Sequence, residues 1–168
     1  MIIYHPASDI NHCAFRFINI LSDVENNQLD WQTLQILDFY YVFPHFLADI
    51  RLPRNPITTK SKLKNIPAAY EALPNPRRLM FGLKALHNET ARALVAKGLL
   101  EKEPFLKNTI KLDTSKIPPA LNGRVELNTK RNTTWYKLLV QVLAHHPLNG
   151  KDGLKDRTQL MEFRYDPT

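Results

Sequence analysis

The pattern of apolar positions predicts a helix over residues 10–24. One face of this segment carries apolar or thiol side chains at helical spacing: Cys13, Phe17, Ile20 and Val24. Asp9 precedes the segment and is a suitable N-cap, because a short carboxylate accepts hydrogen bonds from the first backbone N–H groups of a helix. A polar stretch, DVENNQLD, then separates this helix from the next apolar segment.

A second helix is predicted from Trp31, with Asp30 as its N-cap. Apolar side chains cover it on nearly all sides, which is typical of a helix buried against several neighbours or against another chain. We expect Pro44 to kink or end it. The simpler interpretation is a core helix. The alternative is a partner-facing stripe that consists of Trp31, Phe39, Tyr40 and Phe43.

Residues 51–65 form a basic connector that contains two prolines and no acidic residue. Clustered lysine and arginine side chains favour contact with phosphate groups. Together with basic residues of the following segment, they are candidates for contact with the DNA backbone: Arg51, Arg54, Lys60, Lys62, Lys64, Arg77, Arg78, Arg92 and Lys97. They are equally compatible with an acidic protein surface.

Residues 66–113 are predicted to form a winged-helix-like unit. After a short helix within residues 66–75, Pro76 suits the first turn of a longer helix with Asn75 as its cap. We place a turn at residues 87–88 and a second helix over residues 89–97, which Gly98 ends.

The rest of this unit is expected to form the wing. Leu99 and Leu100 return to the core, EKEPFLKNT forms the wing, and IKLD pairs back as a short β-strand. The front of the second helix is poorly suited to reading bases, because Glu89 repels phosphate and only Arg92 and Asn88 offer suitable chemistry. The winged helix therefore favours docking over sequence-specific recognition.

The whole chain, residues 1–168, is expected to be a single compact domain of mainly α (α+β) class. Its parts are a helical scaffold (1–50), the basic connector (51–65), the winged-helix-like unit with a short β-hairpin wing (66–113), and a C-terminal helix with a closing segment (114–168). In the last part we expect a short strand over residues 124–128, a helix over residues 135–145 and a closing element over residues 160–165.

Composition indicates a protein that works in a reducing compartment. The chain has 168 residues, a formal net charge of +7 and one cysteine, so it has no internal disulfide. The N-terminus lacks the pattern of a signal peptide, and no apolar run is long enough to span a bilayer. We therefore expect a soluble cytoplasmic protein that does not bind a membrane.

No catalytic pattern is evident, and we expect no enzyme, cofactor, metal or small-molecule substrate. There is no glycine-rich phosphate loop and no histidine or cysteine spacing typical of zinc. His145 and His146 are adjacent, so they project about 100° apart on a helix and indicate a polar helix end. Cys13 lies within an apolar stripe, where a buried, unreactive thiol is the simpler interpretation.

Four segments together resemble the small middle components of bacterial ABC three-component systems, which include the small subunit of Lamassu-type antiphage defence: YHPASDINHCAFRFINIL, LDWQTLQILDFYYVFPHFLADIRLPR, PRRLMFGLKAL and ALVAKGLL. The resemblance spans most of the chain and rests on the order of elements. It implies a non-catalytic adaptor bound near the heads of an SMC-like ATPase and connected to an effector nuclease. It supplies no catalytic residue.

Two hypotheses remain open at this point. In the first, the protein is an adaptor subunit whose partners are the SMC-like ATPase and the effector, with non-specific contact to double-stranded DNA. In the second, it is a free-standing winged-helix regulator that binds an operator.

Overall fold

The computed structural model describes residues 6–56, 63, 66, 68 and 72–161. The α-helices within them are α1 (Ile10–Asp23), α2 (Trp31–Val42), α4 (Pro76–Ala96), α5 (Lys102–Leu106), α6 (Pro119–Glu126), α7 (Thr134–Gln141) and α8 (Leu154–Thr158). The strands are β1 (Gln28–Asp30) and β2 (Thr109–Lys111). Short 3₁₀ helices connect them: η1 (Pro6–Ser8), η2 (Glu25–Asn27), η3 (Pro44–Asp49), η4 (Thr114–Lys116), η5 (Thr129–Asn132) and η6 (Leu143–His145).

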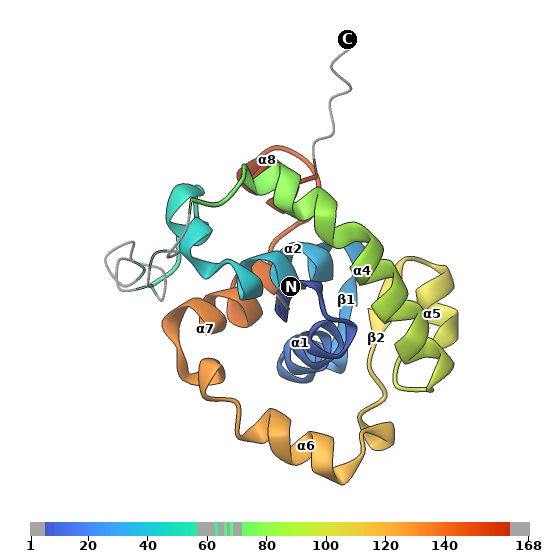
Figure 1. Cartoon of the computed structure of the whole chain (residues 1–168). Helices are drawn as coiled ribbons and strands as arrows, with labels where there is room; N and C mark the ends of the chain where they lie inside the picture. The colour runs from blue at the N-terminus through green and yellow to red at the C-terminus, as the bar shows by residue number, and fades with distance from the viewer. Residues whose placement is uncertain (1–5, 57–62, 64–65, 67, 69–71, 162–168) are drawn as a thin grey trace, which may run out of the picture.

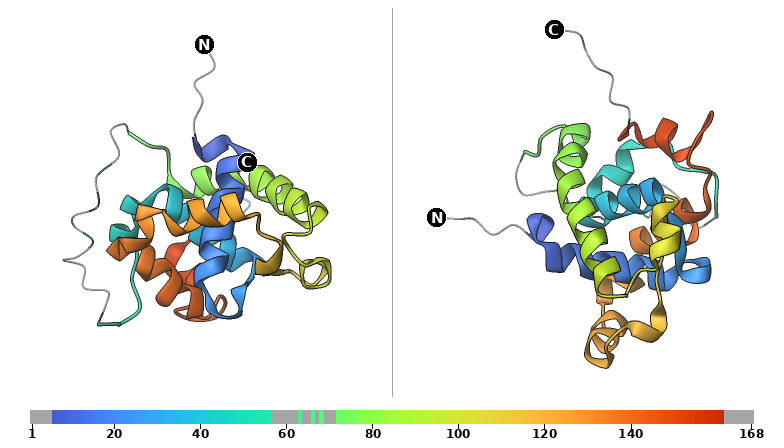
Figure 2. Two further views of the ribbon diagram at one scale, coloured as in Figure 1. Left: turned by 90° about the horizontal axis from the view of Figure 1, so that it is seen from below. Right: turned by 90° about the vertical axis from the view of Figure 1, so that its right-hand side faces the viewer.

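Helix α1 forms as its sequence pattern predicts. The carboxylate of Asp9 accepts hydrogen bonds from the backbone N–H groups of Asn11 and His12, at 2.8 and 2.9 Å, so the predicted N-cap is confirmed. Figure 1 looks nearly along this helix, and α2, α4, α6 and α7 are arranged around it. The two views of Figure 2 show the same arrangement from below and from the side. Helix α1 is therefore the central element onto which the other parts pack.

Helix α2 is buried by the protein's own chain. Asp30 caps it, Pro44 follows its end, and every residue from 33 to 41 is buried. The hypothesis of a partner-facing stripe is therefore wrong for Phe39 and Tyr40, which are 0 and 1 % exposed. Phe43 is 7 % exposed and lines an apolar groove, so for this residue the hypothesis stays a prediction. The fourth member of that stripe, Trp31, is half-buried and packs edge-on against the Phe17 ring of α1. A helix with apolar residues on all sides needs this many neighbours to leave water.

Helix α4 runs without interruption through the position of the predicted turn. Asn75 caps it as expected, and it continues over 21 residues to Ala96, so the helix-turn-helix is wrong. Its buried residues repeat at helical spacing across the predicted break: Met80, Leu83, His87, Thr90, Ala91 and Leu94. His87 is part of this inward face. Gly98, with φ at 76°, follows the helix in the left-handed conformation expected of a glycine there.

The small β-structure differs from a wing in its connections. Strand β1 pairs antiparallel with β2, which joins residues 28–30 to residues 109–111 across the sequence. Residues 102–106 form α5 at the position of the predicted wing, and the predicted return of IKLD onto Leu100 is a single bridge with Leu112. A mainly α fold with a short antiparallel β element is confirmed, but the described residues do not form a winged helix.

The C-terminal part contains more helix than the sequence pattern predicts. The strand predicted over residues 124–128 is wrong, because α6 covers most of this segment and Pro118 and Pro119 favour a helix start there. The helix predicted over residues 135–145 forms as α7, followed by η6. The described residues of the helix predicted over 66–75, which are residues 66, 68 and 72–75, are not helical, and residues 67 and 69–71 lie outside the described residues. Most of the closing element predicted over 160–165 also lies outside them.

The buried apolar side chains of the described residues form one continuous cluster with contributions from α1, α2, α4, β2, α7 and α8. The described N-terminal, middle and C-terminal segments therefore share a core. None of the described helices is both long and apolar enough to cross a membrane.

The continuity of α4 predicts the effect of proline at residue 88. Asn88 is exposed in the middle of the helix, so Asn88→Pro should lower the free energy of unfolding by about 3 kcal/mol or more, measured by urea denaturation. Asn88→Ala is the matched control and should keep or slightly raise stability, because alanine favours a helix. A proline variant as stable as the wild type would indicate a turn at this position.

Candidate functional site

A buried ion pair joins α1 to α2. The Arg16 side chain donates two hydrogen bonds to the Asp38 carboxylate, from Nε to Oδ1 at 2.6 Å and from Nη2 to Oδ2 at 2.9 Å. His87 of α4 contributes a third contact, with Nε2 at 2.9 Å from Asp38 Oδ2. The Asp38 side chain is 0 % exposed and that of Arg16 only 6 %. One carboxylate thus connects the three longest helices of the described chain.

The surroundings keep both members of this pair charged. Burial acts to raise the pKa of Asp38, but the Arg16 charge and the hydrogen bonds from His87 and Arg16 outweigh it and lower the pKa below its ordinary value. Burial acts to lower the pKa of Arg16, and the Asp38 charge and hydrogen bond raise it instead. Because an ionised carboxylate only accepts, His87 Nε2 is the donor. His87 Nδ1 is buried without a hydrogen-bond partner among the described residues.

Cys13 lies in the same place, and with Asp38 and His87 it offers three potential metal-ligand atoms within 4.8 Å of one another. The chemistry does not suit a metal. Both Asp38 oxygens are already bonded to Arg16, whose positive charge repels a cation. Burial, followed by the Asp38 charge, raises the pKa of the Cys13 thiol to about 12, so the thiolate that binds metals is disfavoured. We interpret the cluster as a structural polar centre.

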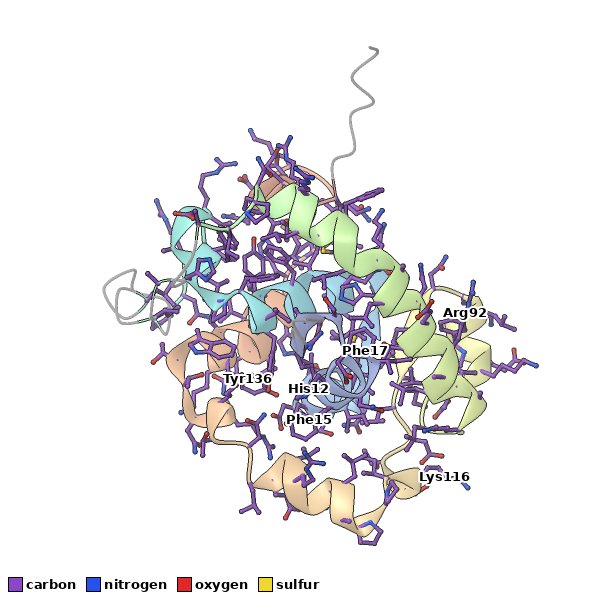
Figure 3. The ribbon with its side chains drawn as sticks, in the orientation of Figure 1. His12, Phe15, Phe17, Arg92, Lys116 and Tyr136 are labelled. Carbon is purple, nitrogen blue, oxygen red and sulfur yellow. The ribbon has the colours of Figure 1, made fainter. Side chains whose placement is uncertain are left out.

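A second polar network holds the C-terminal half against α1. The Tyr136 hydroxyl of α7 lies 2.7 Å from Asp23 Oδ2 and 3.0 Å from the backbone oxygen of Asn19. Arg131 forms a bidentate pair with Asp23. Asn128 donates from its amide to Asn19 Oδ1 at 3.0 Å and to the Tyr41 hydroxyl at 2.9 Å. Burial, and then Asp23, raises the pKa of Tyr136, which keeps its hydroxyl neutral. Tyr136 points toward α1 in Figure 3.

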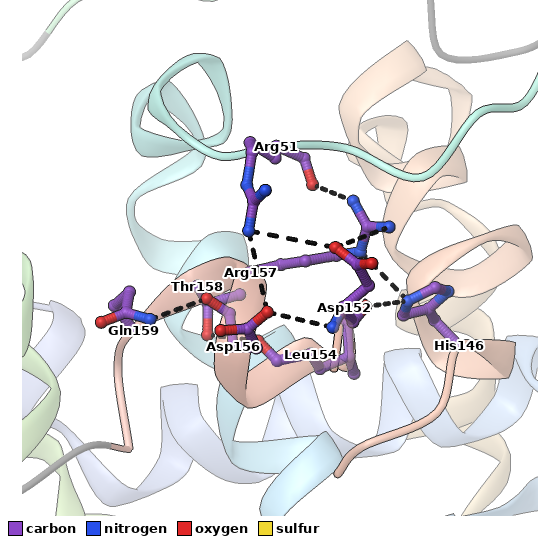
Figure 4. A network of polar contacts seen from close by, with 8 residues as sticks. All are labelled: Arg51, His146, Asp152, Leu154, Asp156, Arg157, Thr158 and Gln159. Atoms are coloured by element: carbon purple, nitrogen blue, oxygen red, sulfur yellow. Dashed lines mark hydrogen bonds and ion pairs between the residues drawn. The ribbon is translucent and has the colours of Figure 1, made fainter. Parts of the chain in front are cut away.

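A third network, on the surface, connects the start of the basic connector to the C-terminal part (Figure 4). Arg157 donates from Nη1 to the Arg51 backbone oxygen at 2.8 Å and from Nε to the Asp152 backbone oxygen at 2.6 Å. The Arg51 side chain lies 3.9 Å from Asp152 and 3.7 Å from Asp156. Because these side-chain pairs are exposed, we expect them to add little to stability.

The predicted DNA-contact residues fall into three groups. Arg51 is in the surface network just described, and Arg77 donates to Gln159 Oε1 and to its backbone oxygen, both at 2.9 Å. The second group is exposed: Arg54, Arg78, Arg92 and Lys97. Figure 3 shows Arg92 on the half of α4 nearer α5. The third group, Lys60, Lys62 and Lys64, lies outside the described residues. Three of the four exposed residues, Arg78, Arg92 and Lys97, therefore lie on α4 or at its C-terminal end.

An apolar groove of about 370 Å³ runs beside the first half of α4. Its described lining residues are Ala7, Ser8, Phe43, Leu73, Pro74, Arg78, Leu79, Gly82 and Leu83. Among them Arg78 is the only charged side chain. On the other flank of the same helix Phe81 is 64 % exposed, which is unusual for a large apolar side chain. Exposed apolar surface beside a basic rim is typical of a site that binds another protein segment.

The polar centre is absent from the sites predicted from the sequence. The sequence does contain a pattern that could have predicted the Arg16–Asp38 pair. Asp38 lies inside a helix with apolar residues on all sides, and Arg16 lies within the apolar stretch of the first helix. Two opposite charges in two buried helices must pair, because an unpaired buried charge is very costly. His87 cannot be found in this way, because the local pattern places it at a turn.

The fold and these surfaces define a mainly α protein with a buried polar centre, an apolar groove and exposed cations. The family model for the ABC-three component (ABC-3C) system Middle Component 5 matches residues 2–166. The chain belongs to this family, and the resemblance to the middle components of ABC three-component systems is confirmed. No curated protein and no solved structure matches the chain significantly.

The polar centre predicts a large loss of stability in Asp38→Asn. The substitution leaves the Arg16 guanidinium buried without its counter-ion, which should lower the free energy of unfolding by about 3–5 kcal/mol in urea denaturation at pH 7. Asp30→Asn is a matched control that should change stability by less than about 0.5 kcal/mol, because asparagine is an equally good N-cap. Equal effects of the two substitutions would contradict the role given to Asp38.

The Arg16–Asp38 pair also predicts how the difference in stability between the wild type and Asp38→Asn depends on pH. The pKa of Asp38 is lower in the folded protein than in the unfolded chain, so the pair stabilises the fold above the ordinary aspartate range of about pH 4. This contribution disappears as pH falls through the folded pKa. The stability gap between wild type and Asp38→Asn, measured by denaturation at several pH values, should therefore narrow on acidification. A gap independent of pH would mean that the carboxylate is not ionised in the folded protein.

Proposed function

We propose that this protein is a non-catalytic adaptor subunit in bacterial antiphage defence, which connects an SMC-like ATPase to an effector nuclease in the cytoplasm. The observation that carries the proposal is the family match over residues 2–166, because a middle component acts with the other components of an ABC three-component system. The buried hydrogen bonds of Asp38 with Arg16 and His87, and of Tyr136 with Asp23, support a structural role, since they hold helices together.

The apolar groove beside α4 is the surface that we propose binds another component. Its floor is apolar, with Phe43, Leu79 and Leu83, and its charged lining residue is Arg78. This combination suits a segment with apolar side chains and a carboxylate, because the carboxylate can pair with Arg78 at the rim. We assign the segment to the SMC-like ATPase of the same system.

Co-purification tests this proposal. The untagged ATPase and effector are co-expressed with the tagged protein, and their recovery is measured. Ser8→Trp places a large side chain at the exposed edge of the groove without altering the core, and it should reduce recovery of the ATPase at least tenfold. Ala120→Trp on the exposed side of α6 is the matched control and should not change recovery.

Three outcomes can be distinguished. Stoichiometric recovery with the wild type and a reduced recovery with Ser8→Trp support both the adaptor and the groove. Equal recovery with both tryptophan variants keeps the adaptor but moves its docking surface elsewhere. A stable wild-type protein that recovers neither component contradicts the adaptor proposal.

A second role, contact with the DNA backbone, is supported by the exposed cations along α4. Arg92 and Lys97 are exposed, whereas Arg51 and Arg77 have partners within the chain. The alternative of a free-standing regulator is less well supported, because the uninterrupted α4 removes the recognition helix on which it depends.

Because Arg51 and Arg77 already have partners within the chain, their removal should affect DNA binding less than the removal of Arg92 and Lys97. The double variant Arg92→Ala/Lys97→Ala should weaken binding to all duplexes alike and lower the salt slope, by about 0.9 for each phosphate that the two side chains neutralise. Arg51→Ala/Arg77→Ala removes the same charge and should have a smaller effect, as measured by fluorescence anisotropy at several salt concentrations. Sequence-selective binding that depends on Arg92 would favour the regulator instead.

A further inference from the structure

The outer side of α4 is a continuous exposed stripe, which we call the α4 ridge. It consists of Arg78, Gly82, Ala85, Glu89, Arg92 and Ala96, all of them exposed. Their spacing alternates between four and three residues, so they lie on one line along the helix. The residues that face the core are on the opposite side of the helix. Figure 1 and the right-hand view of Figure 2 show α4 along the outside of the molecule.

The centre of the ridge has little side-chain bulk. Gly82 is inside a 21-residue helix, where glycine is less favourable than alanine by about 1 kcal/mol. A Cβ atom at this position would meet nothing within 4 Å, so packing within the chain does not require glycine there. Gly82 and Ala85 together allow a second helix to approach closely from outside.

Two of the three charges along the ridge, those of Arg78 and Glu89, are complementary to a second copy of the same ridge. In an antiparallel pair centred between Gly82 and Ala85, Arg78 and Glu89 are equally far from the centre, about 8 Å at 1.5 Å rise per residue. Arg78 of each copy then lies opposite Glu89 of the other. The pairing occurs twice, as twofold symmetry requires. Each Gly82 lies opposite the other copy's Ala85.

The flanks of the ridge also fit twofold symmetry. Phe81, which is 64 % exposed, lies on one flank, and the apolar groove lined by Leu79 and Leu83 lies on the other. The twofold axis of an antiparallel helix pair brings like flanks together. The two Phe81 rings therefore meet on one side of the pair, and the two grooves open on the other side.

We propose that the α4 ridge is the interface through which two copies of this protein associate as an antiparallel, twofold-symmetric homodimer. The dimer does not depend on the adaptor function, because it is tested with this protein alone. It shares Arg78 and Gly82 with the groove, so the dimer and a segment bound in the groove exclude one another at Arg78. The charge pattern favours a second copy over a different helix, since Arg78 and Glu89 are complementary only when the partner has the opposite charges at the same two distances from the centre.

Sedimentation of the purified full-length chain over a wide range of concentrations tests the proposal. The wild type should show a concentration-dependent dimer. Arg78→Glu places like charges opposite one another in both symmetry-related pairs of the dimer, and so does Glu89→Arg. Each variant should raise the dissociation constant of the dimer about tenfold or more. The double variant Arg78→Glu/Glu89→Arg restores both pairs with reversed sign and should recover the wild-type affinity.

Arg92→Glu is the matched control, because it changes the net charge as Arg78→Glu does and lies on the same ridge. Residue 92 is opposite Asn75 of the second copy in the proposed register, so this variant should not weaken the dimer. Circular dichroism confirms that the variants are folded. A wild-type chain that stays monomeric, equal weakening by Arg78→Glu and Arg92→Glu, or a double variant that fails to recover would each overturn the proposal.

Discussion

The carboxylate of Asp38 is buried in the middle of α2, where Arg16 from α1 and His87 from α4 hold it. Such a pair adds little net stability compared with an apolar core, because both charges lose their water. Its hydrogen-bond directions are demanding, however, and they restrict the relative placement of the three helices. We therefore regard this contact as the constraint that sets how α1, α2 and α4 pack, while apolar burial supplies most of the free energy.

The other polar networks extend this arrangement outward. Tyr136 and Arg131 meet Asp23 near the far end of α1, and Asn128 joins α1 to Tyr41 of α2. Arg157 and Arg51 then connect the C-terminal part to the start of the connector. Buried or bidentate polar contacts of this kind hold helices in fixed positions. The outer side of α4 is consequently presented on a helix that the polar contacts hold in place.

The family assignment and the exposed surfaces lead to the same view of the protein. A middle component of an ABC three-component system has partners, and the described surface offers an apolar groove beside α4 and an exposed ridge with cations along the same helix. These features share one helix, so binding at one of them can affect the others. Arg78 and Gly82 belong both to the ridge and to the lining of the groove, so a homodimer formed through the ridge would compete with a partner segment for Arg78.

Interactions between near neighbours along the chain are enough to predict several elements of the fold. Helix α1 with its Asp9 cap, the start of α2 at Asp30, the Asn75 cap and the glycine after α4 all follow from local hydrogen bonding and apolar spacing. The mainly α class follows from the same local patterns. These features can be predicted because every group that stabilises them lies within a few residues.

Contacts between distant segments explain the features that the sequence pattern does not predict. A histidine and an asparagine between two apolar stretches are compatible with a turn at residues 87–88. His87 instead continues the helix because its side chain meets Asp38, 49 positions away in the sequence. The polar centre, the pairing of β1 with β2 and the burial of the α2 aromatic residues also depend on such distant partners. The residues near each of these groups in sequence do not determine these contacts, so the contacts form only when the helices pack against one another.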